Sequence, residues 1–422
     1  MFHLHRNKCR HSPPLSNPPP VPNSPHITTP KVVPPSIPPV AHHFTSTFAA
    51  PHPTSVASTP PRLRWIDTSR AVAVILVVLF HVTIGHYYLM AWVGGLETGR
   101  WARINQILSI IRMPLLFALS GVLASGKIHR GFRRGKAILG AATNYWLYTI
   151  WLITYGIFIL CMPPDFPTPH KVASLDQWLI QLWLPNTYLW YLFALSTYIL
   201  LFTALRRVPP WITLTALFIL HLIAVQAWSL ESALWTRAFT YAIFFGLGVH
   251  GRAILTRMAS SPPLTILTAI TSWAIYQPIG MTRLLSLAPP GPGYATLIAL
   301  LYITLGLTAV GFVGCLVRIP HLATPLTYLG HHTLGIYTLH IPLATILNLI
   351  TLGLSTGLGS TIRSIPCAVF LYPILATTIV IAGCVLLEKI LRRIPTLAFL
   401  FTLPKPLAKA CEHLRTTLNN TT

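Results

Sequence analysis

Long apolar segments recur along this chain from Arg70 onward, and they constrain its fold more than any other feature. A helix needs about 20 predominantly apolar residues to cross a bilayer core of about 30 Å. Ten segments of roughly this length can be marked: 71–92, 104–125, 137–161, 178–203, 211–228, 238–256, 263–280, 295–317, 333–354 and 366–388. They predict an all-α, polytopic membrane protein with about ten transmembrane helices.

The charges are few and unbalanced, with 30 Lys and Arg against 7 Asp and Glu, for a net charge of +23. Nucleic acid binding would suit such an excess, but the basic residues flank the apolar segments instead of forming a patch with interleaved aromatics. Cytoplasmic loops of membrane proteins carry the excess of Lys and Arg. With a cytoplasmic N-terminus, the outside loops hold only Arg100, Arg103, Lys171, Arg237, Arg283 and Arg363. The charge pattern therefore predicts that both termini are cytoplasmic and that nucleic acid is not a partner.

The chain divides by composition into three parts. Residues 1–61 are rich in proline and lack periodicity, which predicts a disordered cytoplasmic tail. Residues 62–394 hold the apolar segments and form the membrane domain, and residues 395–422 form a short basic cytoplasmic tail. The 6 cysteines are scattered without metal-ligand spacing, so they indicate neither a metal site nor a disulfide framework.

Arg70 and His81 lie in or beside the first apolar segment, where a purely lipid-facing helix needs neither. Eleven residues make about three helical turns, so the two side chains share one face about 16 Å apart along the axis. With Arg70 at the cytoplasmic edge, His81 lies near the middle of the bilayer. An ionisable residue at that depth is a functional candidate, and a neutral histidine bonded to a neighbouring helix is the structural alternative.

Arg112 lies inside the second apolar segment, at nearly the same predicted depth as His81. A buried guanidinium needs a counter-charge, and a snorkelling arginine is the structural alternative. No acidic residue lies well inside any of the ten segments, since Glu388 is at the inner end of the last. The partners left open are carbonyls at a helix C-terminus, Asp67 or Glu97 reaching inward, or an anion supplied by a ligand.

Five short motifs carry further information. They are the Arg70-x10-His81 pair preceded by "RWID", "RMPLLFALSG" at 112–121, "YLWYLFAL" at 188–195, "FFGLGV" at 244–249 and "LGHHTLGIYTLHIPL" at 329–343. Together they resemble acyltransferase family three, a family of integral membrane acyltransferases, over about residues 62–390. The chain departs from the family pattern at Ala71, where glycine is frequent, and at Tyr188, where histidine is common. "RMPLLF" also has one aromatic residue where two are usual.

The resemblance implies transfer of an acyl group, usually acetyl, from cytoplasmic acyl-CoA to a hydroxyl of a cell-envelope sugar, glycan or glycolipid. His81 would act as general base or as a covalent acyl relay, and Arg112 would hold the thioester oxyanion or a CoA phosphate. Arg70, Arg133 and Arg134 are the candidates for binding the CoA phosphates. The expected location is the cell membrane, with acyl-CoA as co-substrate, no permanently bound cofactor or metal, and room for an extracytoplasmic partner protein.

Further site candidates lie on other predicted helices. His340 and Tyr337 share one face of the ninth segment, and a packing role beside a proline is the alternative for His340. Trp190 is expected to line a cavity, and Ser120 to allow close helix contact. His331 and His332 are expected at the membrane interface.

A transporter or flippase of a glycolipid or anionic substrate is the rival function. Such a carrier would also have about ten helices and cationic groups near the midplane. Against it, familiar proton-coupled carriers use intramembrane carboxylates, and none lies inside the predicted segments.

Overall fold

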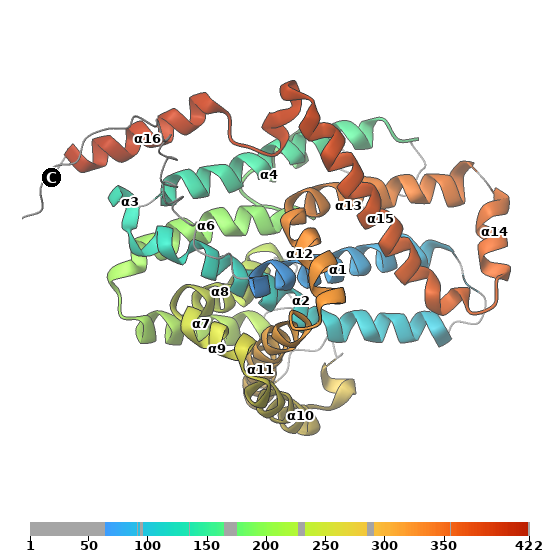
Figure 1. Ribbon diagram of the computed structural model, residues 1–422, viewed down its shortest axis with the longest axis horizontal. Helices are drawn as coiled ribbons and strands as arrows, with labels where there is room; N and C mark the ends of the chain where they lie inside the picture. Colours follow the sequence, from blue (N-terminus) through green and yellow to red (C-terminus); the bar gives the residue numbers. More distant parts are fainter. Residues whose placement is uncertain are drawn as a thin grey trace, which may run out of the picture. The chain divides into compact units, whose positions relative to one another are not determined.

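The computed structural model describes residues 64–90, 92, 96–134, 136–163, 175–226, 233–284, 291–354 and 356–420. Every regular element in these ranges is helical, as Figure 1 shows, so the all-α class is confirmed for them. The longer helices are α1 (Arg64–Gly85), α2 (Leu96–His129), α4 (Ala137–Leu160), α6 (Trp190–Ala204), α7 (Pro210–Gln226), α8 (Ala233–His250), α10 (Pro262–Leu284), α11 (Pro292–Leu316), α13 (Thr333–Asn348), α15 (Ala368–Arg393) and α16 (Lys405–Asn420). The shorter elements are η1 (Tyr87–Met90), α3 (Gly131–Arg134), α5 (Leu175–Ile180), η2 (Leu205–Arg207), α9 (Arg252–Ser260), α12 (Pro320–His331), η4 (Leu349–Leu354), α14 (Thr356–Ser364) and η5 (Pro395–Leu400). The predicted tail 1–61 lies outside the described residues.

Several helices are suited to a membrane. Among the described residues, five stretches are long and apolar enough to cross a bilayer: Arg64–Met90, Gly99–His129, Gly293–Leu316, Thr333–Leu352 and Ala368–Arg393. A sixth arises if α8 and α9, which meet at a bend of 82°, form one broken span. Each of the ten predicted segments overlaps at least one helix. A multi-pass membrane protein is therefore supported, while ten spans and cytoplasmic termini stay predictions.

Three predicted segments differ from the helices that form. Because α1 begins before the first predicted segment, Arg70 lies inside the helix and not at its edge. The segment 178–203 is interrupted between α5 and α6, where Pro185 has no amide hydrogen to continue a helix. The segment 238–256 is broken at Gly251, between α8 and α9.

Helix α2 is packed on several sides, against α8, α1 and α11. Glycines bring α2 and α8 into backbone contact, since a Cβ atom at Gly121 would lie 2.1 Å from the Phe245 carbonyl oxygen, and one at Gly248 would lie 2.0 Å from that of Ala118. Helix α1 also packs against α2, α12, α13 and α15, and Figure 1 shows α1 at the centre of the bundle. Side chains of α1 and α2 therefore point into the interior of the bundle.

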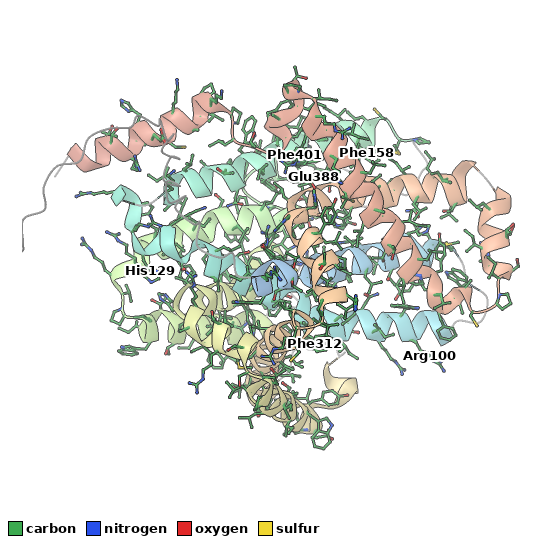
Figure 2. The ribbon with its side chains drawn as sticks, in the orientation of Figure 1. Arg100, His129, Phe158, Phe312, Glu388 and Phe401 are labelled. Carbon is green, nitrogen blue, oxygen red and sulfur yellow. The ribbon has the colours of Figure 1, made fainter. Side chains whose placement is uncertain are left out.

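The C-terminal region 395–422, predicted as a basic tail, is helical over most of its length. Tryptophans of α4 fix its start, with Trp146 Nε1 donating to the Phe399 carbonyl at 2.9 Å and Trp151 Nε1 to the Leu400 carbonyl at 2.7 Å. The guanidinium of Arg392 lies 4.5 Å from the ring centroid of Phe401 (Figure 2). These contacts place α16 against α3 and α4.

Candidate active site

His81 on α1 and His340 on α13 form a histidine pair, with His81 Nδ1 3.1 Å from His340 Nε2. The other nitrogen of His340, Nδ1, lies 2.8 Å from the Tyr337 carbonyl oxygen and 3.2 Å from that of Ile336. Because a carbonyl only accepts hydrogen bonds, His340 Nδ1 carries the hydrogen and its Nε2 is the acceptor. When both rings are neutral, His81 Nδ1 must donate, which leaves the lone pair of His81 on Nε2.

Three tyrosines connect this pair to α2 and α6. The Tyr188 ring packs edge-on against His81, with centroids 4.9 Å apart, and its carbonyl accepts a 2.7 Å hydrogen bond from the Tyr337 hydroxyl. The Tyr337 ring lies 5.5 Å from that of Tyr191. The Tyr191 hydroxyl is 2.5 Å from Ser120 Oγ and must be the donor, since Ser120 donates its own hydrogen to the backbone of α2. The structure thus joins Ser120 and Tyr337 to the surroundings of His81.

Arg112 is buried, with 6% of its surface exposed, and its Cζ lies 4.1 Å from the ring centroid of Phe80. The Phe80 centroid is 5.1 Å from that of His81, so the guanidinium and the imidazole are separated by no more than the sum of these distances. Arg112 Nη1 is buried without a hydrogen-bond partner among the described residues. The phenols of Tyr241 and Tyr302 lie close enough to interact with its charge. The structure thus brings Arg112 and His81 into one neighbourhood, and their common depth in a bilayer stays a prediction.

Asp67, one of the counter-charges considered for Arg112, has partners at its own end of α1. Its Oδ1 lies 3.8 Å from Arg70 Nη1 and its Oδ2 lies 3.3 Å from His331 Nε2. The Arg70 side chain is partly exposed, with 28% of its surface accessible.

A second carboxylate cluster lies on α15. Glu388 is 1% exposed, and its two oxygens bind His332 Nδ1 at 2.9 Å and Arg392 Nε at 2.8 Å. Figure 2 shows Glu388 on α15. His331 and His332, predicted to be interfacial, are therefore each bonded to a buried carboxylate. Glu97, the other counter-charge considered for Arg112, has a side chain outside the described part of the chain.

The remaining arginine candidates lie beyond the end of α2. Arg133 is exposed on α3, and the side chain of Arg134 is not among those described. The chain turns into α3 at Gly131, whose φ of 75° favours glycine and where a Cβ atom would lie 2.7 Å from Arg206 Nε. This end of α2 is about 25 Å along the helix from Arg112, at 1.5 Å per residue. Arg133 is therefore separate from the histidine pair.

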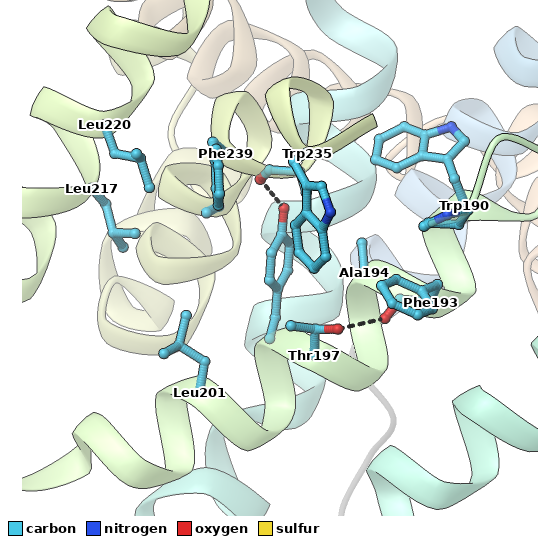
Figure 3. A pocket seen from close by; sticks show the side chains of 13 residues that line it. Trp190, Phe193, Ala194, Thr197, Leu201, Leu217, Leu220, Trp235 and Phe239 are labelled. Atoms are coloured by element: carbon cyan, nitrogen blue, oxygen red, sulfur yellow. Dashed lines mark hydrogen bonds between the residues drawn. The ribbon is translucent and has the colours of Figure 1, made fainter. Parts of the chain in front are cut away.

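Trp190 lines a cavity, as the sequence predicts. The cavity, about 80 Å³, lies between α6, α7 and α8, and Figure 3 shows Trp190, Phe193, Trp235 and Phe239 around it. The Trp190 ring also contacts two aromatic residues outside the cavity lining, with its centroid 5.6 Å from that of Phe117 and 5.9 Å from that of Tyr241.

Two buried histidines are absent from the sequence-based candidates. His86 is bonded on both nitrogens, to Asn348 Oδ1 at 2.5 Å and the Tyr372 hydroxyl at 2.6 Å. His221 on α7 binds the Thr240 carbonyl through Nδ1 at 2.6 Å, and its Nε2 has no partner among the described residues. The signal for His221 was its position inside an apolar segment, the same signal that singled out His81.

Comparison with known proteins gives one match. A family model described as an acyltransferase domain, of acyltransferase family 3, matches residues 63–389, which is well over half of the 422 residues. No curated protein and no solved structure matches the chain.

Proposed function

This chain belongs to acyltransferase family 3, and we propose that it moves an acyl group, most simply acetyl, from cytoplasmic acyl-CoA to a hydroxyl of a cell-envelope sugar, glycan or glycolipid. Membership makes it a membrane acyltransferase. The donor, the acceptor, the side of the membrane and the identity of the membrane are parts of the proposal. The observation that carries the proposal is the His81–His340 pair near a buried arginine nitrogen that has no hydrogen-bond partner in the described part of the chain.

The histidine pair suits proton transfer at His81 Nε2. In the proposed reaction this nitrogen takes the proton of the acceptor hydroxyl while the oxygen bonds to the thioester carbonyl carbon. The carbon–sulfur bond then breaks, and the CoA thiolate takes the proton back from His81. His340 positions the ring throughout, because its Nδ1 is fixed by two carbonyls and its Nε2 receives the His81 Nδ1 hydrogen bond.

A covalent relay is the second route that His81 allows. There Nε2 bonds to the acyl carbon as the carbon–sulfur bond breaks and the CoA thiolate leaves. In the second step the acceptor oxygen bonds to the acyl carbon as the bond to Nε2 breaks, and the hydroxyl proton passes to the CoA thiolate. The neutral tautomer with its lone pair on Nε2 serves both routes equally. If the protein becomes acylated when acyl-CoA is added without an acceptor, the relay is favoured.

Arg112 supports the proposal by its unsatisfied charge. Negative charge develops on the thioester oxygen when the tetrahedral intermediate forms, and a buried donor directed at it lowers the barrier. Arg112 Nη1 is proposed as this donor, since it is buried without a hydrogen-bond partner among the described residues, and the Phe80 ring contacts both the guanidinium and the His81 ring. The family's arginine motif and this placement agree.

The CoA phosphates are assigned to the basic residues of the predicted cytoplasmic side. Arg70 lies inside α1 near Tyr191, and Arg133 is exposed beyond α2, with Arg134 next to it. Their order along the path from Arg133 to His81 suits a donor that enters with its acyl end first. An extracytoplasmic partner protein that presents the acceptor remains part of the proposal.

The test uses purified protein and acetyl-CoA labelled in the acetyl group. Transfer of label to an added envelope glycan or glycolipid extract, or release of labelled acetate, supports an enzyme. A transporter or flippase would do neither, and it would instead move its substrate across the membrane of a sealed vesicle. Vesicle transport without any loss of the thioester would contradict the proposal.

A further inference from the structure

Asn105 on α2 is a buried asparagine whose side-chain amide makes no hydrogen bond. Its exposed fraction is 3%, and neither Oδ1 nor Nδ2 has a partner in the described part of the chain. A buried polar group without a partner is unfavourable for folding. The amide of Asn105 therefore does not help to hold the bundle together, and its donor and acceptor are both unused.

The position of Asn105 on α2 directs its side chain into the bundle. Trp101, one turn earlier, is also buried, whereas residues 102–104 and 106 are exposed. Trp101, Asn105 and Arg112 are spaced by four and seven residues, so they lie along one face of the helix. The exposed neighbours occupy the other faces, and Asn105 thus points toward the same interior as Arg112.

Asn105 and Arg112 are two buried polar side chains with unused hydrogen bonds on one face of one helix. Arg112 Nη1, like the amide of Asn105, lacks a partner among the residues that the structure describes. Seven residues are close to two turns, and they separate the two Cα atoms by about 10 Å along the helix axis. Because helical side chains tilt toward the N-terminus, the Arg112 side chain leans toward Asn105.

The direction from Arg112 to Asn105 leads away from the proposed donor entrance. Arg133 and Arg134, assigned to the CoA phosphates, follow the C-terminal end of α2, and Asn105 lies toward its N-terminal end. The charge pattern predicts that this N-terminal end is extracytoplasmic. A donor that enters from the Arg133 end reaches Arg112 before Asn105, so Asn105 lies on the side from which a cell-envelope acceptor approaches.

We propose that Asn105 binds the acceptor glycan through two of its hydroxyls, on the extracytoplasmic side of the hydroxyl that is acylated beside His81 and Arg112. A side-chain amide offers donor hydrogens and an acceptor oxygen, and a hydroxyl can both donate and accept. One sugar hydroxyl donates to Oδ1 and a neighbouring hydroxyl accepts from Nδ2. This inference rests on the proposed function and names a binding residue for its acceptor. Asn105 takes no part in making or breaking bonds.

The experiment follows two reactions of the full-length, detergent-purified protein with acetyl-CoA labelled in the acetyl group. One is transfer to an added envelope glycan extract, and the other is release of labelled acetate without the extract. Asn105→Leu replaces the amide by an apolar side chain of similar shape. Its apparent KM for the extract should rise about tenfold, the effect of about one hydrogen bond, with kcat unchanged because only binding is lost. Acetate release should be unchanged, because water needs no amide to hold it, and the thermal midpoint should not fall.

Three further variants make the comparison specific. Asn105→Gln keeps the amide one methylene further out and should restore part of the affinity for the extract. Asn348→Leu removes a buried asparagine that is bonded to His86 and to the Gly85 carbonyl, so it should lower the thermal midpoint and leave the KM unchanged. Gln106→Leu, on the exposed side of α2, should change neither quantity.

Each failure has a distinct result. An unchanged KM for the extract in Asn105→Leu overturns the inference and makes Asn105 a packing residue or the partner of a buried water. An equal loss of acetate release and glycan transfer would place Asn105 at the donor and would also overturn it. Acetate release by the wild type without transfer to any glycan overturns the inference and leaves the thioester chemistry of the proposed function intact. No loss of the thioester under any condition overturns both.

Discussion

Glu388 and Arg112 are both ionisable residues buried in helices of the same bundle, and their surroundings differ. Glu388, near the end of α15, has hydrogen bonds to His332 and Arg392 on its two oxygens. Arg112, in the interior of α2, has the face of Phe80 on one side and an unpaired Nη1 on another. The carboxylate of Glu388 is paired within the protein. No carboxylate among the described residues pairs with Arg112.

The same contrast separates the histidines. His86 uses both ring nitrogens within the protein, whereas His221 Nε2 is buried without a hydrogen-bond partner among the described residues. A buried group with all its bonds made holds helices together, because removing it strands its partners. A buried group with a bond left over adds less to folding and is available to a substrate. The contrast therefore divides the buried polar residues into those that assemble the bundle and those that act in it.

The largest effect on stability is expected at Glu388. Glu388→Ala removes the hydrogen-bond acceptor of His332 and Arg392 and should lower the free energy of unfolding by about 1–3 kcal/mol, the cost of leaving buried polar groups without a partner. The measurement is the thermal midpoint of the detergent-purified protein followed by size-exclusion chromatography. Glu412→Ala, on the exposed surface of α16, is the control and should leave the midpoint unchanged. An unchanged thermal midpoint in Glu388→Ala would show that Glu388 does not stabilise the bundle and would contradict its contrast with Arg112.

Substitution of Arg112 should impair acyl transfer without lowering the thermal midpoint. Arg112→Met removes an unpaired buried charge, so the thermal midpoint should stay equal or rise, while acyl transfer falls by about 10²–10³, the usual cost of losing one oxyanion donor. Arg112→Lys keeps the charge without the planar fork and should retain residual transfer. Arg103→Met, exposed on the same helix, is the control. A fall in midpoint as large as that of Glu388→Ala would mean that Arg112 has a structural partner.

The structural features behind these predictions can be predicted from the sequence to different degrees. Every predicted apolar segment overlaps helix, because a chain in lipid must satisfy its own backbone hydrogen bonds, although 178–203 and 238–256 are broken by Pro185 and at Gly251. The common depth of His81 and Arg112 follows from helical rise alone. The pairing of His81 with His340 does not, because it depends on which helices are neighbours and joins residues 259 positions apart. For the same reason, the sequence could not exclude Asp67 as a counter-charge for Arg112. The structure pairs Asp67 with Arg70 and His331 instead.

The smallest effect is expected outside the bundle. Arg133 is exposed, and an exposed charge is worth about 0.2–1 kcal/mol. Arg133→Gln, alone or with Arg134→Gln, should raise KM for acyl-CoA by a few-fold at low salt, with the difference shrinking as ionic strength rises. Lys409→Gln on α16 serves as the control for net charge. An unchanged KM at low salt would remove these arginines from the CoA site.

The most direct measurement compares His81→Ala with His86→Ala, two histidines five positions apart. Acyl transfer per folded molecule and thermal midpoint are measured for both. His81→Ala is expected to lose about 10²–10⁴ in transfer, as for a general base, or more if His81 is a covalent relay, with a midpoint near that of the wild type. His86→Ala is expected to lower the midpoint, because Asn348 and Tyr372 lose a partner, and to keep transfer within a few-fold. Wild-type transfer by His81→Ala would make His81 a packing residue and would contradict the account, with His340 the next residue to test.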